Sequence, residues 1–191
     1  KIYNTKSLDH LGSSRKWIKK LGVENFDEYS VRASSGCLFK CTFCHIGKRT
    51  NRYRKISDFI DELKVFPKYS NVKFLSADLL ANKEWVTNLA NEIINNKIKI
   101  RWMTDSRFNW FDDLNFLKLI EKSGCKRIDV GLESFNNKIL KSYKKAYNTD
   151  FIQEKITNIC KTNITLGINM MIGNPEDDLA SINQTCEYYT Y

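Results

Sequence analysis

The feature of the sequence that most constrains the fold is an alternation of short β-like runs with amphipathic helical runs. The pattern predicts strands at residues 28–34, 71–78, 99–107, 126–134 and 165–173. It predicts helices at residues 57–66, 82–96 and 112–124, the last one capped by Asp112 and ending at Gly124, with more helical sequence after the fourth and fifth strands. The strand starts lie roughly 25 to 40 residues apart, which is the spacing of βαβ units and indicates a parallel sheet.

Two parallel α/β architectures fit this order, and the segment after the first strand separates them. A doubly wound sheet usually has a glycine-rich phosphate loop there, whereas this chain has a cluster of cysteines. We therefore expect a partial (βα)6 TIM-type barrel, whose chemistry lies on the loops beyond the carboxyl ends of the strands. The sequence begins at Lys1 and ends within an expected helix, so we expect a fragment truncated before the last strand.

The length and the hydropathy of the chain indicate one domain and no membrane segment. Its 191 residues suffice for one sizeable core, and we expect a leader at residues 1–27, with a helix around 13–22, and a core domain at 28–191. No apolar run of about eighteen residues is present, and the first residues lack the hydrophobic stretch of a secretion signal. The expected compartment is the cytoplasm.

The three cysteines Cys37, Cys41 and Cys44 lie within eight residues, with no fourth cysteine beside them. Because a structural metal site completes its coordination shell, this spacing indicates a metal centre left open on one side. A zinc site with His45 as the fourth ligand is disfavoured, since closed zinc sites generally draw their ligands from two separated pairs. The other cysteines are expected to be inert core residues: Cys125, Cys160 and Cys186.

Polar residues recur where the predicted strands end. If the chain forms a barrel, these ends meet at one rim, so residues far apart in the sequence would converge on a single site. A purely structural explanation does not predict this recurrence. The residues concerned are Asp78 after the second strand, Asp105 and Arg107 after the third, Glu133 and Ser134 after the fourth, and Gly173, Asn174, Pro175 and Glu176 after the fifth.

The cysteine pattern is CxxxCxxC with Phe43 before the last cysteine, and it is followed in order by FLSAD, GCKRIDVGLES and MMIGNPEDD. Together these segments resemble the radical S-adenosylmethionine (radical SAM) superfamily, closest to its cobalamin-associated branch and to the methylthiotransferases. The resemblance covers residues 28 to 185. The four ordered segments make it highly specific, whereas CxxxCxxC alone would be moderately so.

The resemblance implies that the three cysteines hold three irons of a 4Fe–4S cluster, while the fourth iron binds the amino and carboxylate groups of S-adenosylmethionine. Reductive cleavage would then give a 5′-deoxyadenosyl radical that abstracts hydrogen from a substrate. The implied reaction is methyl transfer or another C–H functionalisation of a small molecule or peptide. The implied electron donor is a reducing partner such as flavodoxin or ferredoxin.

The resemblance also implies roles for residues that bind S-adenosylmethionine. Phe43 matches the aromatic residue that lies against the adenine, and Glu133 matches the carboxylate that contacts the ribose hydroxyls. Arg107 is suited to a bidentate pair with the carboxylate of S-adenosylmethionine. Asp78 would accept a hydrogen bond from the amino group, although Ala77 replaces one of the two acidic residues that the cobalamin-associated branch often has there.

The segment MMIGNPE resembles the family's fifth-strand motif. The resemblance implies that the backbone near Met171 and Ile172 lines the adenine and that Gly173 permits a tight turn. Asn169 stands where the motif usually has glycine, so the match is approximate at that position. The cobalamin motif DxHxxG is not matched, because residues 9–12 have its letters without its spacing. Cobalamin is therefore expected only through a domain not present in this sequence.

The formal net charge is +9, and the basic stretches KWIKK, KRTNRYRK and KSYKK could form a surface for phosphate or nucleic acid. They are more typical of solvated lysines and arginines in a Lys/Asn/Ile-rich composition. The charge keeps two alternatives open: a radical SAM enzyme of the methylthiotransferase type that modifies RNA, and a basic nucleic-acid-binding module with a structural metal site. The second leaves the cysteine spacing and Glu133 unexplained.

Overall fold

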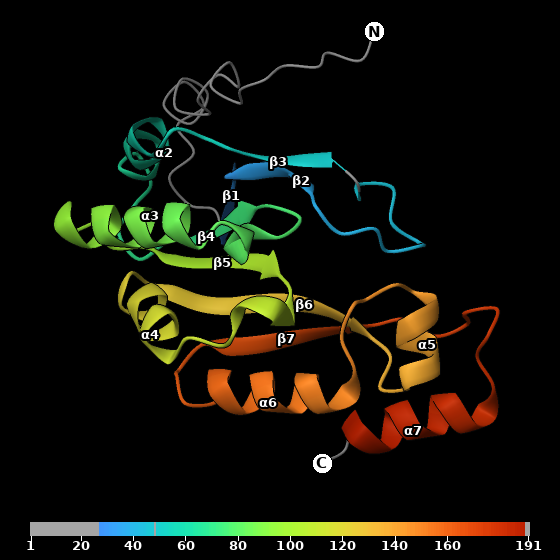
Figure 1. Ribbon diagram of the computed structural model, residues 1–191. Helices are drawn as coiled ribbons and strands as arrows, with labels where there is room; N and C mark the ends of the chain where they lie inside the picture. The colour runs from blue at the N-terminus through green and yellow to red at the C-terminus, as the bar shows by residue number, and fades with distance from the viewer. Residues whose placement is uncertain (1–26, 48, 190–191) are drawn as a thin grey trace, which may run out of the picture.

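The computed structural model describes residues 27–47 and 49–189 of the chain (Figure 1). The helix expected around residues 13–22 and the stretch 9–12 lie outside the described residues. Within the described ranges, no helix combines the length and apolar composition needed to cross a bilayer.

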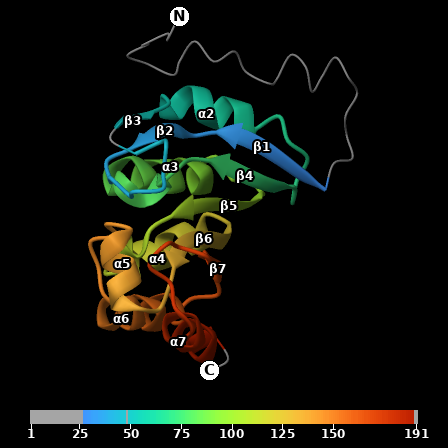
Figure 2. The same ribbon diagram turned by 90° about the vertical axis from the view of Figure 1, so that its right-hand side faces the viewer.

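The centre of the fold is a five-stranded parallel sheet with the strand order β1-β4-β5-β6-β7. This arrangement confirms the α/β class and the partial barrel expected from the spacing of the strands, and Figure 2 shows the curved row of strands from their carboxyl ends. The strands are β1 (Glu28–Arg32), β4 (Asn71–Leu75), β5 (Arg101–Ser106), β6 (Cys125–Glu133) and β7 (Thr165–Met170).

The helices lie along one face of this sheet, as Figures 1 and 2 show. Val72 and Phe74 of β4 point into the helical layer and are completely buried, while the intervening Lys73 belongs to the opposite, polar face. The helices are α2 (Ile56–Leu63), α3 (Lys83–Asn95), α4 (Leu114–Lys122), α5 (Asn137–Ser142), α6 (Thr149–Ile159) and α7 (Leu179–Tyr189), with short 3-10 turns η1 (Leu79–Ala81) and η2 (Phe108–Trp110).

The start of α4 corrects one expectation. The predicted cap, Asp112, is wrong by one residue, because the carboxylate of Asp113 accepts the backbone N–H of Phe116 at 3.0 Å. The predicted end of the helix is confirmed. Gly124 follows the last turn with a φ of +103°, which glycine adopts without the steric cost of a side chain.

A two-stranded hairpin lies beside the main sheet and corrects the prediction of a single strand at 28–34. The chain leaves the sheet at Arg32, forms β2 (Ser34–Cys37), and returns in the antiparallel strand β3 (Arg49–Tyr53). Gly36 permits this pairing, since it has a φ of +90° and a Cβ there would meet the carbonyl oxygen of Thr50 at 2.3 Å. The loop that carries the cysteines therefore projects from the tip of a hairpin.

A buried ion pair holds the end of this hairpin against α2. Arg54 Nη1 lies 2.5 Å from Glu62 Oε2, and both side chains are almost completely buried. The indole N–H of Trp85 on α3 donates to the carbonyl oxygen of Arg54 at 2.7 Å, which adds a second connection to the core.

We expect Glu62→Ala to lower the free energy of unfolding by about 3 kcal/mol, because it leaves the buried guanidinium of Arg54 without its charge partner. Urea denaturation followed by circular dichroism measures this change. The control is Asp61→Ala, which removes the exposed Asp61–Lys64 pair on the same helix and should cost less than about 1 kcal/mol. Equal losses in the two variants would show that the buried pair does not stabilise the hairpin.

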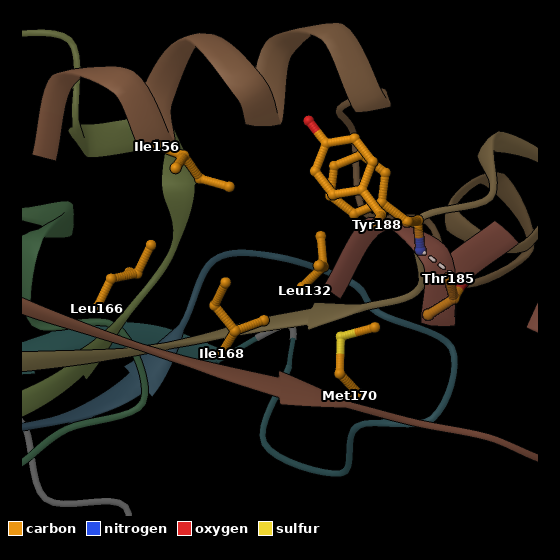
Figure 3. Close-up of a pocket in the computed structure, with 8 residues that line it drawn as sticks. Leu132, Ile156, Leu166, Ile168, Met170, Thr185 and Tyr188 are labelled. Carbon is orange, nitrogen blue, oxygen red and sulfur yellow. Dashed lines mark hydrogen bonds between the residues drawn. The ribbon is translucent and has the colours of Figure 1, made fainter. Parts of the chain in front are cut away.

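A hollow of about 340 Å³ lies between the end of the sheet and helices α6 and α7 (Figure 3). Its lining is apolar apart from the hydroxyls of Tyr188 and Thr185, and the hydroxyl of Thr185 accepts the backbone N–H of Phe135 at 3.0 Å. The rings of Phe135 and Tyr188 stack beside it, so the hollow belongs to the packing of α7 on β6 and β7.

Candidate active site

The cysteine loop is fixed to α5 by its middle residues. The backbone N–H of Thr42 donates to the carbonyl oxygen of Tyr143 at 3.2 Å. The Thr42 hydroxyl donates to the carbonyl oxygen of Ser142, also at 3.2 Å. Cys41 and Cys44 are joined by a turn in which the Cys44 N–H donates to the Cys41 carbonyl oxygen at 3.2 Å. All three thiols of the motif are partly exposed, so they remain accessible to a metal centre.

Arg107 connects this loop to the carboxyl end of β5. Its side chain is buried, and Nη1 donates to Cys41 Sγ at 3.3 Å while Nη2 donates to the carbonyl oxygen of Lys145. The guanidinium carbon lies 3.8 Å from the centre of the Phe39 ring, a close cation–π contact. The sequence predicted Arg107 as a site residue, and the structure places it directly beside a motif cysteine.

Glu133 and Lys145 form a buried ion pair on the other side of Arg107. Lys145 Nζ lies 3.1 Å from Glu133 Oε1, with side-chain exposures of 3% and 9%. Burial lowers the pKa of Lys145, and the neighbouring Glu133 carboxylate partly opposes that shift. Lys145 was not predicted as a site residue, because it lies in the basic run KSYKK, which is typical of solvated lysines.

The backbone around this pair is unusual. Glu133, Lys144 and Ala146 all have positive φ angles, of 72°, 56° and 59°, although none of them is glycine. Residues with side chains rarely adopt this region and do so at a cost of about 1 to 3 kcal/mol each. Such strain is typical of functional sites, and here it surrounds the two charged residues that face each other.

Asp78 lies at the end of β4 and is buried. Its carboxylate accepts the hydroxyl of Ser106 at 2.8 Å and the indole N–H of Trp110 at 2.9 and 3.1 Å. Burial raises the pKa of Asp78, and these two hydrogen bonds oppose the shift. Ser106 is the last residue of β5 and Trp110 ends the η2 turn that follows it, so the ends of β4 and β5 are joined.

The residues expected to surround the adenine lie around the same edge. Phe43 is 42% exposed and contacts the Tyr143 ring edge-on, with ring centres 4.9 Å apart. The backbone N–H of Met171 donates to the carbonyl oxygen of Glu133 at 2.9 Å, which places the end of β7 beside that carboxylate. The side chains of Met171 and Ile172 are exposed, and Gly173 has a φ of +95° with open space where a Cβ would stand.

The cysteines of the motif supply the thiol donors that a 4Fe–4S cluster binds. Within residues 27–47 and 49–189, no three His, Cys, Asp or Glu side chains lie close enough together to hold one metal ion. Ligands of one tetrahedral zinc would have their sulfurs about 3.8 Å apart, whereas each thiolate of a 4Fe–4S cluster binds a different iron and needs wider spacing. The number and type of donors, three thiols, match what three irons of a cluster would bind.

Two other cysteines correct the sequence analysis. Cys160 and Cys186 were expected in the core, but both are exposed: Cys160 is the C-cap residue of α6, and Cys186 lies in α7. Cys125 is buried as expected, and burial strongly raises the pKa of its thiol, so it stays protonated.

The three cysteines of the motif lie near the carboxyl edge of a parallel βα sheet, where barrel enzymes carry their active sites. The family model of the radical SAM superfamily matches residues 31–187, and the chain belongs to that family. The cofactors of this family are a 4Fe–4S cluster and S-adenosylmethionine.

Relatives and solved structures agree with this assignment. The chain is 24% identical over 167 residues to the bacteriochlorophyllide d C-12(1)-methyltransferase of Chlorobaculum tepidum, covering 83% of this chain and 36% of the relative. Its fold is similar to that of the cobalamin-dependent S-adenosylmethionine radical enzyme OxsB, solved with aqua-cobalamin bound. The TM-score is 0.75 at 16% sequence identity, and the match covers 83% of this chain and 26% of OxsB.

A third similarity is to the radical S-adenosylmethionine methyltransferase TsrM from Kitasatospora setae, with cobalamin and a 4Fe–4S cluster bound. The TM-score is 0.72 at 15% identity, covering 85% of this chain and 32% of that one. At these identities the solved structures establish the fold. The chain spans about a third of the length of its curated relatives.

Proposed function

We propose that residues 28–191 form a core domain that binds a 4Fe–4S cluster through Cys37, Cys41 and Cys44 and cleaves S-adenosylmethionine reductively. When bound, these cofactors would supply a 5′-deoxyadenosyl radical for hydrogen abstraction. The observation that carries the proposal is the contact series from Cys41 through Arg107 and Lys145 to Glu133. This series joins the cysteine loop to the ends of β5 and β6 in one continuous site.

The residues around this series would bind S-adenosylmethionine. Arg107 would pair with its carboxylate, and Glu133 would accept hydrogen bonds from the ribose hydroxyls. Lys145 would act as a positioning residue, because its ammonium group holds the Glu133 carboxylate at 3.1 Å. The adenine would lie among the exposed side chain of Phe43 and the backbone of residues 171–173, where Gly173 leaves open space.

We further propose that the completed reaction is methyl transfer or another C–H functionalisation of a small molecule or peptide. Two similar proteins, from Chlorobaculum tepidum and Kitasatospora setae, are named as methyltransferases. Cobalamin would bind only through a domain outside this sequence, and a flavodoxin or ferredoxin would supply the electron. Modification of RNA by a methylthiotransferase-type enzyme is the alternative, supported by the net charge of +9.

The test is an anaerobic assay on protein reconstituted with iron and sulfide. After reduction with dithionite and addition of S-adenosylmethionine, mass spectrometry should detect 5′-deoxyadenosine. The Cys41→Ala variant, treated identically, should form none. Absence of 5′-deoxyadenosine from wild-type protein that carries a complete cluster would contradict the proposed cleavage.

A separate prediction concerns Asp78, proposed to accept a hydrogen bond from the amino group. The pKa of Asp78 is raised above its ordinary value of 3.8 in the folded state, so the ionised carboxylate destabilises the fold. This loss of stability is absent below pH 3.8 and reaches its full size above the pKa of the folded state. We therefore expect Asp78→Asn to leave the free energy of unfolding at pH 7 unchanged or increased. The same variant should raise the KM for S-adenosylmethionine by about tenfold, because a charge-assisted hydrogen bond is lost.

Urea denaturation and substrate-free formation of 5′-deoxyadenosine measure these two quantities. A control, Asp113→Asn, removes an exposed carboxylate that caps α4 and pairs with Lys83. It should leave the KM unchanged and slightly lower the stability. A destabilised Asp78→Asn variant with an unchanged KM would assign Asp78 a structural role instead.

A further inference from the structure

A second cavity, of about 370 Å³, opens on the polar face of the sheet between the β2–β3 hairpin and the ends of β1 and β4. Its lining includes three arginines and one aspartate: Arg32, Arg49, Arg52 and Asp105. None of the residues proposed to bind the cluster or S-adenosylmethionine lines it. We propose that this cavity binds an anionic group of the substrate, a carboxylate or a phosphate, an assignment to substrate that rests on the proposed function.

The charge balance of the cavity favours an anion. The carboxylate of Asp105 already accepts a hydrogen bond from Lys73 Nζ at 2.9 Å, so its charge is compensated from outside the cavity. Across the described ranges 27–47 and 49–189, the guanidinium groups of Arg32 and Arg49 form no ion pair or hydrogen bond with a protein carboxylate. The positive charge in the cavity is therefore in excess.

Hydroxyl groups add to the polar lining. Ser34 and Ser76 share a hydrogen bond of 2.6 Å across the two sheets, which fixes the hairpin against the end of β4. The buried hydroxyl of Ser35 has no hydrogen-bond partner among the described residues, and an unsatisfied buried hydroxyl is costly. A bound oxyanion would accept from this hydroxyl and pair with guanidinium groups, which match carboxylate and phosphate oxygens in a bidentate manner.

The position of the cavity suits a substrate. The proposed contacts to S-adenosylmethionine lie at the ends of β5, β6 and β7, whereas the arginines come from β1 and the hairpin (Figure 2). The two groups of residues meet at β4, where Ser76 lines the cavity and its hydroxyl accepts the backbone N–H of Asp78 at 3.1 Å. A substrate anchored by its anionic group would thus lie next to S-adenosylmethionine on the polar face of the sheet.

The experiment is a titration of the isotope-labelled full chain with inorganic phosphate and, separately, with acetate, followed by the backbone amide signals of Ser35 and Gly36. We expect saturable shifts, and the tighter anion identifies phosphate or carboxylate as the preferred group. The double variant Arg32→Gln/Arg49→Gln should raise the Kd for that anion by about tenfold or more. The single variant Arg32→Gln should raise it by a smaller factor.

The matched control is Arg101→Gln, which removes an exposed arginine at the opposite, amino end of β5. Its Kd should equal that of the wild type. An unchanged Kd in the double variant, or an equal rise in the control, would overturn the anion site.

A second measurement separates the substrate from S-adenosylmethionine, which also carries a carboxylate. In substrate-free formation of 5′-deoxyadenosine, the double variant should keep the KM for S-adenosylmethionine within about twofold of the wild type. A tenfold rise would assign the arginines to S-adenosylmethionine and overturn the assignment to substrate. The titration needs neither the cluster nor S-adenosylmethionine, so it tests the anion site independently of the proposed function. Wild-type protein that binds the anion but forms no 5′-deoxyadenosine would contradict the proposed function and still support the anion site.

Discussion

Replacing Cys41 with alanine is expected to leave the reconstituted protein with less than about a tenth of the cluster iron of the wild type. The iron is lost because the cluster is held by thiolate ligands, and the two cysteines that remain in the motif cannot hold it. Cys37→Ala and Cys44→Ala should have the same effect. Iron and sulfide analysis, together with the visible absorbance of the cluster, measures it. The structure supports equal effects, since Cys37 ends β2, Cys41 and Cys44 lie in the loop that follows it, and all three residues are partly exposed.

The control for this prediction is Cys160→Ala. Cys160 is also exposed, but it is the C-cap residue of α6 and does not belong to the cysteine motif, so its removal should leave the iron content unchanged. Wild-type iron content in all three motif variants would refute the assignment of the cluster. A loss of iron in Cys160→Ala as well would indicate adventitious iron bound by any accessible thiol.

The parallel sheet could be predicted because its signals are local. The strands after β1 are short runs that alternate with amphipathic helices, and the predicted strand starts at 28, 71 and 165 coincide with those observed. The β2–β3 hairpin could not be predicted in the same way. Its second strand reads RTNRY, which has no alternation of apolar and polar residues, and its pairing depends on the close approach of Gly36 to Thr50.

The candidate site was predictable where topology alone brings residues together. Asp78, Arg107 and Glu133 end successive strands of a parallel sheet, so their convergence follows from the order of the elements. Lys145 was not predictable, because it lies in a loop between α5 and α6 whose course depends on positive φ angles at Lys144 and Ala146. The sequence shows only a basic run there, which is ordinarily solvated.

The buried pair of Glu133 and Lys145 leads to the second large effect. We expect Lys145→Met to lower the free energy of unfolding by about 3 to 5 kcal/mol, because it leaves the Glu133 carboxylate buried without a charge partner. Methionine keeps the length and the apolar part of the lysine side chain, so the loss reports the charge rather than a cavity. Urea denaturation of the apo protein measures it.

Two comparisons show whether the pair itself is responsible. Lys83→Met breaks the ion pair between Lys83 and Asp113, whose side chains are 47% and 37% exposed. This change should lower the free energy of unfolding by less than about 1 kcal/mol. The double variant Glu133→Gln/Lys145→Met should recover more than about half of the loss, because no unpaired charge then remains buried. Equal costs for Lys83→Met and Lys145→Met would contradict this account.

The same variants separate holding the site in place from binding the cofactor. If Lys145 positions Glu133 for the ribose, the double variant should fold nearly as well as the wild type but bind S-adenosylmethionine at least about tenfold more weakly. The affinity falls because the glutamine amide accepts hydrogen bonds from the ribose through one neutral oxygen, whereas the glutamate accepts them through a charged carboxylate. Equilibrium dialysis with the reconstituted protein measures this affinity. Wild-type affinity in a stable double variant would restrict the buried pair to a structural role and remove Glu133 from the proposed binding site.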